Sequence, residues 1–228
     1  ITDHAGFYGV VRFAEAARAV GLPTVFGAEV SLLREGGGGA DGPGGAPEWA
    51  PLVVLARGPE GYARLARALS AAQLAGEKGA PRLTLDELAA LAPASAGSAG
   101  GSSAGSSGGW AVLTGGGQGP VAAALHARGP AAAARELDRL VEAFGVGAVH
   151  VELWDHGDPL DSPRNDALAD LAVRRGVGLV ATNHVHYATP ARRRLAMALA
   201  AVGARRSLEE ADGWLPGGSG AHLRSGAE

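Results

Sequence analysis

Two histidines that follow a short apolar run offer the clearest chemistry in this sequence. His184 and His186 lie in the stretch 181–187, directly after residues 177–180, whose apolar character is typical of a buried parallel strand. Residues two apart on an extended backbone point to the same face. Neutral imidazole is a good ligand for Zn, Mn or Fe, so the pair predicts a transition-metal site. The pair alone also fits two histidines that are hydrogen-bonded to backbone where a strand meets a loop.

Three more strand ends carry side chains of the same kind. Asp3 and His4 end the first extended segment, Glu29 lies in the expected strand 24–33, and His156 follows the expected strand 149–154. Imidazoles with a carboxylate and open positions bind a hydrolytic Zn, Mn or Fe centre, which lowers the pKa of bound water and holds a phosphate oxygen. Asp3 would be a ligand or the carboxylate that orients His4. The simpler alternatives are a turn at His156 and an ion pair between Glu29 and an arginine.

The other histidines give weaker signals. His150 shares strand parity with His156 but lies about 20 Å from it along a straight strand, so it is left out of the site. His126 falls on a helix and is expected at the surface, and His222 in a polar tail is unassigned. The arginines at 192–194 and 205–206 fit a solvated helix face better than a contact with nucleic acid.

Strands and helices alternate along the chain, which predicts a mostly parallel α/β sheet with crossover helices. A closed or nearly closed barrel is the first choice and an open doubly wound sheet the second, and in both ligands gather at the C-terminal ends of the strands. Thr84 opens a capping-box pattern, and Thr189 with Pro190 is expected to begin a helix. The expected strands are residues 1–4, 24–33, 52–55, 110–114, 149–154 and 177–180. The expected helices are 8–20, 59–74, one from 84, 119–127, 131–144, 165–175 (with Ser162 and Pro163 suited to its N-terminus) and 189–202.

Composition narrows the class of protein. The chain has 228 residues, a net charge of -3 and no cysteine, which excludes disulfides and thiolate metal sites and fits a reducing, cytoplasmic compartment. No apolar run approaches the roughly 20 residues of a membrane span. The glycine-rich stretch 36–45 is expected to be a flexible loop, and the Gly/Ser-rich insertion 94–109 to be disordered. Because the chain starts at Ile1 rather than Met, we expect a piece of a longer protein.

Ordered motifs then indicate a family. Ile-Thr-Asp-His, Phe-Gly-Ala-Glu, Gly-Tyr-Ala-Arg-Leu, Val-Glu-Leu-Trp-Asp-His-Gly-Asp and Ala-Thr-Asn-His-Val-His-Tyr resemble the polymerase-and-histidinol-phosphatase (PHP) domain at the N-terminus of bacterial DNA polymerase III alpha subunits. The closing Asp-Gly-Trp-Leu-Pro and Ala-His-Leu-Arg-Ser runs are most similar to the error-prone branch. The resemblance covers residues 1–228 as one partial PHP domain, interrupted by the insertion at 94–109. It implies a distorted (β/α)7 barrel with an incomplete first strand and a metal cluster at its mouth.

The resemblance also assigns individual residues. His4, Glu29, His156 and His186 match metal ligands of the family, and His184 stands where many members have Asp. The family's first His-x-His motif would precede Ile1, and Pro51 stands where another histidine is expected. Residues 115–118, Gly-Gly-Gly-Gln, replace basic residues. These departures imply that this chain cannot assemble a full trinuclear centre by itself.

The implied parent is an error-prone DNA polymerase that acts in translesion repair, with DNA, dNTPs, a sliding clamp and accessory mutagenesis proteins as partners and no membrane. Its nucleotidyl transfer would use Mg held by aspartates outside this chain, so no residue here is assigned to that step. The expected cofactor of this domain is a divalent Zn, Mn or Fe ion. The resemblance leaves open whether the domain acts as a phosphoesterase or exonuclease or is a vestige of one. The alternatives are a free-standing phosphoesterase of the histidinol-phosphatase kind and a non-catalytic scaffold within the polymerase.

Overall fold

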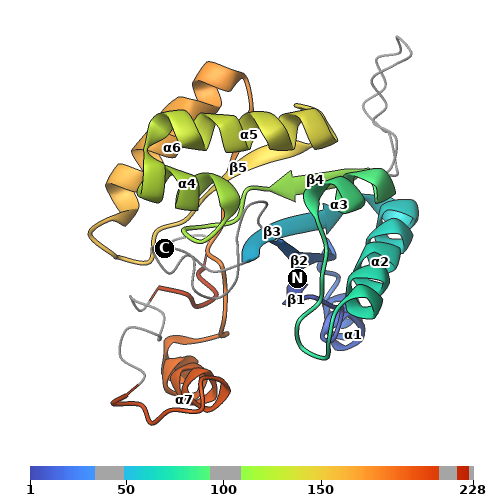
Figure 1. The fold of residues 1–228 in the computed structure, drawn as a ribbon. Coiled ribbons are helices and arrows are strands. Elements are labelled where there is room, and N and C mark those ends of the chain that lie inside the picture. Colours follow the sequence, from blue (N-terminus) through green and yellow to red (C-terminus); the bar gives the residue numbers. More distant parts are fainter. Residues whose placement is uncertain (34–48, 93–108, 211–219, 226–228) are drawn as a thin grey trace.

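A computed structural model describes residues 1–33, 49–92, 109–210 and 220–225. Its described strands form one sheet in the order β1-β2-β3-β4-β5-β6, so neighbours in sequence are neighbours in space (Figure 1). The α/β class expected from the sequence is confirmed. The strands are β1 (Thr2–His4), β2 (Gly27–Leu33), β3 (Trp49–Ala56), β4 (Trp110–Leu113), β5 (Val149–Leu153) and β6 (Gly178–Ala181). The helices are α1 (Val10–Ala19), α2 (Gly58–Ala75), α3 (Leu85–Leu91), α4 (Pro120–Arg128), α5 (Pro130–Phe144), α6 (Asp161–Arg175), the 3-10 turn η1 (Pro190–Arg192) and α7 (Arg193–Gly203).

Strand β3 departs from the expected strand direction. The pairs β1·β2, β4·β5 and β5·β6 are parallel, whereas β3 runs antiparallel to both β2 and β4. The beginning of β3 therefore lies at the edge of the sheet where the other strands end. Pro51, near that beginning, pairs with Ser31, two residues along β2 from Glu29. Because the period of a strand is two, Pro51 lies on the face that carries Glu29.

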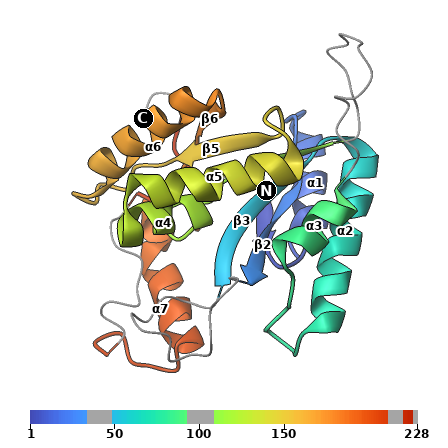
Figure 2. The ribbon, with the colours of Figure 1, turned by 45° about the horizontal axis from the view of Figure 1, so that its top comes forward.

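The two faces of the sheet differ in their covering. Val30, Leu52, Val112 and Val151 project from four neighbouring strands into one core that also takes Leu65 of α2. Helices α2 to α6 contribute to this core, and Figure 2 shows α5 running along β5. The alternating residues face the other way, and they include Glu29 and Glu152. The helix-covered face is apolar, and the opposite face carries the ionisable side chains.

The sheet curls so that its two edges approach at one end. Six flat strands would separate β1 from β6 by about 24 Å. The ring of His4, at the end of β1, nevertheless lies 6.4 Å from the ring of His186, in the loop after β6. Strong curvature at the C-terminal strand ends accounts for this approach, as in the barrel that the sequence predicted.

The helix starts agree with the sequence prediction at Thr84 and differ from it at two other helices. Thr84 caps α3 with the predicted capping box. Thr189 precedes η1 without a side-chain cap, and α7 begins only at Arg193. Helix α6 begins at Asp161, four residues before the expected start, because Asp161 fixes the preceding loop through its carboxylate.

Some predictions cannot be compared with the structure. The glycine-rich stretch 36–45 and the insertion at 94–109, apart from Gly109, lie outside the described residues. The Asp-Gly-Trp-Leu-Pro run does as well. Among the helices of the described ranges, none has the length and apolar character needed to cross a lipid bilayer.

Candidate metal site at the strand ends

The first half of the candidate site joins β1 to β2. His4 Nδ1 lies 2.7 Å from Glu29 Oε1, with 71% of the His4 side chain and 14% of the Glu29 side chain exposed. The hydrogen bond to Glu29, with the charge of that carboxylate, raises the pKa of His4 above its usual range despite partial burial. Burial alone would raise the pKa of Glu29, but the bond to His4 and nearby imidazoles outweigh it and lower that pKa. This half is therefore an ion pair with its carboxylate shielded.

Asp3 lies apart from this ion pair. Its Oδ2 accepts a hydrogen bond from the backbone N–H of Gly9 at 2.7 Å, at the N-terminus of α1. A carboxylate at this position satisfies a donor that the helix cannot pair internally. The imidazole of His4 is held by Glu29 instead, so the structure places Asp3 in a helix-capping position next to the site.

The second half gathers around Trp154, just after β5. The Trp154 ring stacks on His184 at 4.2 Å and on His156 at 5.5 Å between ring centroids. His184 in turn lies 4.3 Å from the ring of His186, edge to face. Burial, with the charge of His186, lowers the pKa of His184 to about 4, and burial also lowers the pKa of His186. At neutral pH both imidazoles are therefore neutral, which is the form that binds a metal.

His184 also adopts an unusual backbone conformation. Its φ is +38°, in the left-handed region that residues other than glycine seldom enter, although His, Asn and Asp do so more often than the rest. Such conformations persist where the surroundings hold them and are common at functional sites. The stacking on Trp154 supplies contacts that hold His184 in this conformation. Trp154 was not predicted as a site residue, although it stands beside Asp155 and His156 in one of the family motifs.

His156 is held at both its backbone and its ring. Its N–H donates to Asp161 Oδ2 at 2.8 Å, and its Nε2 lies 2.8 Å from the carbonyl oxygen of Asn183. Arg164 pairs with Asp161 Oδ1 at 2.7 Å and donates to the carbonyl of Trp154 at the same distance. This network links the start of α6 to the loop that carries His156.

A buried glutamate lies beneath the histidines. Glu152 is 4% exposed; its Oε1 accepts a hydrogen bond from Thr182 at 2.6 Å, and its Oε2 is buried without a hydrogen-bond partner in the structure. Burial raises the pKa of Glu152, and the nearby carboxylate of Glu29 adds to that rise. Sequence reasoning missed this residue, whose signal is an acidic side chain inside an otherwise apolar strand.

The predicted ligands converge, but their donors are not arranged around one point. His4 approaches His186, and His184 lies 6.5 Å from His156 between ring centroids. In the part of the chain that the structure describes, no three His, Cys, Asp or Glu side chains take up an arrangement that could hold a metal ion. The set of neutral imidazoles and one carboxylate nevertheless fits the donor chemistry of Zn, Mn or Fe.

The loop after β4 supports the second half of the site. Gly116 is buried against the Trp154 ring so closely that a Cβ atom there would overlap the ring. Gly115 has a φ of +70°, and a Cβ there would meet the carbonyl oxygen of Pro51 at 2.6 Å. The glycines at the positions where basic residues were expected thus allow close packing beside the histidines.

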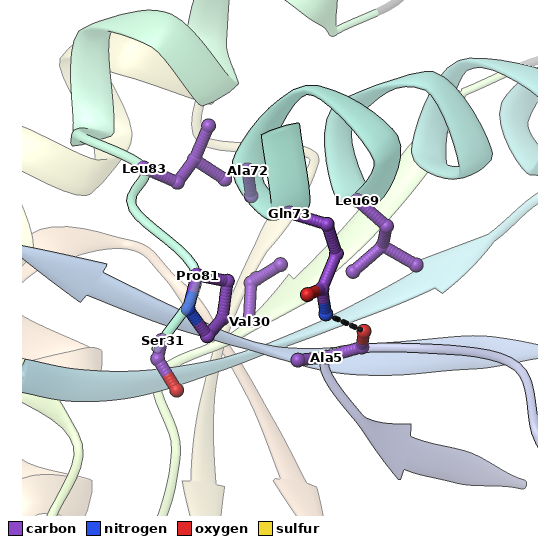
Figure 3. A pocket seen from close by; sticks show the side chains of 8 residues that line it. All are labelled: Ala5, Val30, Ser31, Leu69, Ala72, Gln73, Pro81 and Leu83. Carbon is purple, nitrogen blue, oxygen red and sulfur yellow. Dashed lines mark hydrogen bonds between the residues drawn. The ribbon is translucent and has the colours of Figure 1, made fainter. Parts of the chain in front are cut away.

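A small apolar pocket lies behind the first half (Figure 3). Leu69, Val30 and Leu83 line it, and Gln73 of α2 donates a hydrogen bond to the carbonyl of Ala5 at 3.0 Å. Ala5, which follows His4, has a φ of +49°. The pocket contains none of the predicted ligands, and Val30 places it on the helix-covered side of the sheet. Its hydrogen bond therefore anchors the turn after His4 rather than forming part of the site.

Comparisons with known proteins agree with this fold and with the motifs. The family model described as "PHP domain" matches residues 1–156. The chain is 53% identical to proteins named error-prone DNA polymerase from Mycolicibacterium paratuberculosis and Mycobacterium tuberculosis, and 49% identical to one from Cutibacterium acnes. Each match covers 100% of this chain and 19% of the relative. The chain thus spans about a fifth of the length of these curated relatives.

Proposed function

The chain belongs to the PHP domain family, and from that premise we propose that it is the PHP module of an error-prone DNA polymerase that binds a divalent metal ion. The convergence of His4, Glu29, His184, His186 and His156 from opposite edges of the sheet carries the metal-binding part of the proposal. Identity over the full chain to named polymerases supports the polymerase parent.

Each half of the site has its own role in this proposal. His184 and His186, neutral at physiological pH, supply nitrogen lone pairs, and Glu29 supplies the negative charge that favours a cation over a proton. His4 would hold the ion through the ring nitrogen that does not face Glu29. A bound Zn, Mn or Fe ion supplies an acidified water and a positive charge for a phosphate oxygen. The chain's own contribution is to keep these donors oriented and partly shielded from water.

The test of metal binding uses the 228-residue chain and a matched pair of variants. We expect the chain to bind Zn or Mn in equilibrium titration, and His186→Ala to weaken that binding by at least roughly tenfold. His126→Ala changes an exposed helix position and should leave binding unchanged. No binding above background by the chain would remove the metal-binding part of the proposal.

The polymerase parent has a separate test. Because the chain covers 19% of its relatives, an antibody raised against it should detect a protein roughly five times its mass in an immunoblot of the source cells. A single band near the 22.7 kDa of this chain would contradict the proposal. That result would favour the free-standing phosphoesterase, for which phosphate monoesters are the substrates to assay.

A scaffold role within the same polymerase is the second candidate. It is favoured by Pro51, which stands on the ligand-bearing face of β3 without a donor, and by the absence of an arranged metal group among the described residues. In this role DNA, dNTPs, the sliding clamp and mutagenesis partners would contact other parts of the polymerase, whose nucleotidyl transfer would use Mg. Exonuclease activity of the metal-loaded chain that disappears in His186→Ala would exclude the scaffold role.

A further inference from the structure

A short segment near the C-terminus lies against the loop that carries His184 and His186. We call residues 220–224 the clasp segment. The N–H of His186 donates to the carbonyl of Ala221 at 2.9 Å, and the N–H of Leu223 donates to the carbonyl of Tyr187 at 3.1 Å. Tyr187 and His222 form a parallel bridge. The clasp segment therefore pairs with the histidine loop as a short strand would, although no strand was predicted there from the sequence.

Asn183 connects the clasp segment to His156. Its Nδ2 donates to the carbonyls of Gly220 at 2.7 Å and of His222 at 2.6 Å. Its own backbone carbonyl lies 2.8 Å from His156 Nε2. Because a carbonyl oxygen can only accept, Nε2 must carry the proton, and in the neutral ring the lone pair is then on Nδ1. One asparagine thus joins the clasp segment and fixes which nitrogen of His156 is available.

Gly220 makes the third contact, directly with the backbone of His156. Gly220 is buried, and a Cβ there would lie 2.9 Å from the Cα of His156. Arg224 continues past it and donates from Nη2 to the carbonyl of Asp155 at 2.8 Å. Only a residue without a side chain allows the clasp segment to pass so close to the loop after β5.

We propose that the clasp segment, with Asn183, is a positioning element of the histidine cluster: it holds the His186 backbone in place and keeps His156 in the tautomer that presents Nδ1. The clasp segment lies beyond the residues matched by the family model. The inference deepens the proposed metal-binding function and rests on it, because a fixed tautomer matters to a ring that binds an ion. Hydrogen-bond partners on the ring nitrogen that does not face the ion orient metal-binding imidazoles in this way.

The test is made first on the metal-free 228-residue chain. Histidine ring ¹⁵N NMR, assigned with a His156→Gln variant, reports the tautomer, and hydrogen exchange reports the protection of the His186 N–H. Gly220→Ala places a methyl group against His156, and Asn183→Asp turns a carboxylate oxygen toward two carbonyls. Both are expected to mix the tautomers of His156 and to speed His186 exchange by roughly tenfold or more.

Gly147→Ala is the matched control, since a Cβ there meets no atom within 4 Å. It should preserve the wild-type tautomer and exchange rate. If Gly220→Ala and Asn183→Asp also leave the tautomer and the exchange rate unchanged, the inference is overturned. If either variant unfolds the chain, Arg224→Ala replaces it in the test, because it removes only one exposed hydrogen bond. It should speed exchange at Leu223, and unchanged exchange there would overturn the inference equally.

Metal titration separates this inference from the function on which it rests. If the chain binds Zn, Gly220→Ala should weaken binding roughly tenfold, as the loss of a group that orients a metal-binding imidazole does. If the chain binds no metal, the proposed function fails. The tautomer and exchange measurements on the metal-free chain would still decide whether the clasp segment positions the histidines.

Discussion

The two halves of the strand-end cluster use the same residue type in opposite states. At the β1–β2 edge, His4 is largely exposed and Glu29 raises its pKa, so it tends to hold a proton. Beyond β6, His184 is packed under Trp154, and burial lowers its pKa to about 4. The difference teaches that the partner and the burial of an imidazole, rather than its place at a strand end, decide whether it presents a lone pair.

The strongest way to break this contrast is to disturb the packing of the second half. Gly116→Ala places a methyl group into the Trp154 ring. We expect it to lower the free energy of unfolding by about 2–3 kcal/mol, the usual cost of overpacking, and to separate Trp154 from His184. Denaturant unfolding measures the first effect, and Trp fluorescence together with the His184 NMR titration measures the second.

Gly147→Ala makes the same chemical change where a Cβ meets no atom within 4 Å. Its unfolding free energy should stay within about 0.5 kcal/mol of the wild type. A His184 pKa that remains near 4 in Gly116→Ala would show that Trp154 does not create the buried environment of the second half.

The two halves should change the unfolding free energy in opposite directions as the pH rises. An unfolded histidine takes up a proton near pH 6.5, whereas folded His184 resists protonation until about pH 4. Unfolding free energy should therefore fall as the pH drops from 6.5 to 4. Asparagine tolerates the positive φ at this position. His184→Asn should therefore reduce the fall in unfolding free energy between pH 6.5 and 4 by on the order of 2 kcal/mol.

The His4–Glu29 pair should act in the other direction. Because the folded pKa of His4 is raised, its stabilisation is complete below pH 6.5 and is lost as the pH rises through the folded value. Glu29→Gln should flatten the unfolding free energy on that alkaline side. Because the folded pKa of Glu29 is lowered, the variant should also remove the loss of stability that protonation of this carboxylate causes in acid. Equal effects of His184→Asn and Glu29→Gln over the whole pH range would contradict the contrast between the halves.

The smallest expected effect tests whether Asp3 belongs to the first half of the site. Asp3→Ala removes the acceptor for the Gly9 N–H and should cost about 1 kcal/mol of unfolding free energy, as the loss of a helix cap does. Metal affinity should not change, since Asp3 is engaged with α1. A tenfold loss of metal affinity in Asp3→Ala would make Asp3 a ligand, as one of the sequence interpretations allowed.

The sequence predicted the elements well where local chemistry decides them. The capping box at Thr84 and the apolar cores of β4 and β5 follow from residues close in sequence. The reversed direction of β3 could not be predicted from strand–helix alternation, because direction depends on pairing with β2 and β4. Ser162 and Pro163 were expected near the start of α6, but the helix itself was predicted only from residue 165, because the carboxylate of Asp161 stabilises the start by accepting from backbone donors of the preceding loop.

The side chains that converge at the strand ends could be predicted from the sequence, whereas the residues that support them could not; their role as metal ligands remains a proposal. The spacing of His184 and His186 and the strand-end positions of His4, Glu29 and His156 were readable as a pattern. Trp154, Glu152 and most of the clasp segment lie inside the family motifs, but the contacts through which they act form only after folding and could not be predicted from those motifs. Asn183 carried no signal, since an asparagine that binds two carbonyls and an asparagine in solvent look alike in sequence.

Because the sheet curls, the candidate site is assembled from strands that join the sheet at different stages of folding. His4 meets His186 only after β6 has been added to the far edge of the sheet. Contacts so distant in sequence form slowly, because a long loop must close first. Glu29 and His4 would thus be paired for some time before the other imidazoles reach them, and the proposed metal site would be assembled only once the sheet is complete.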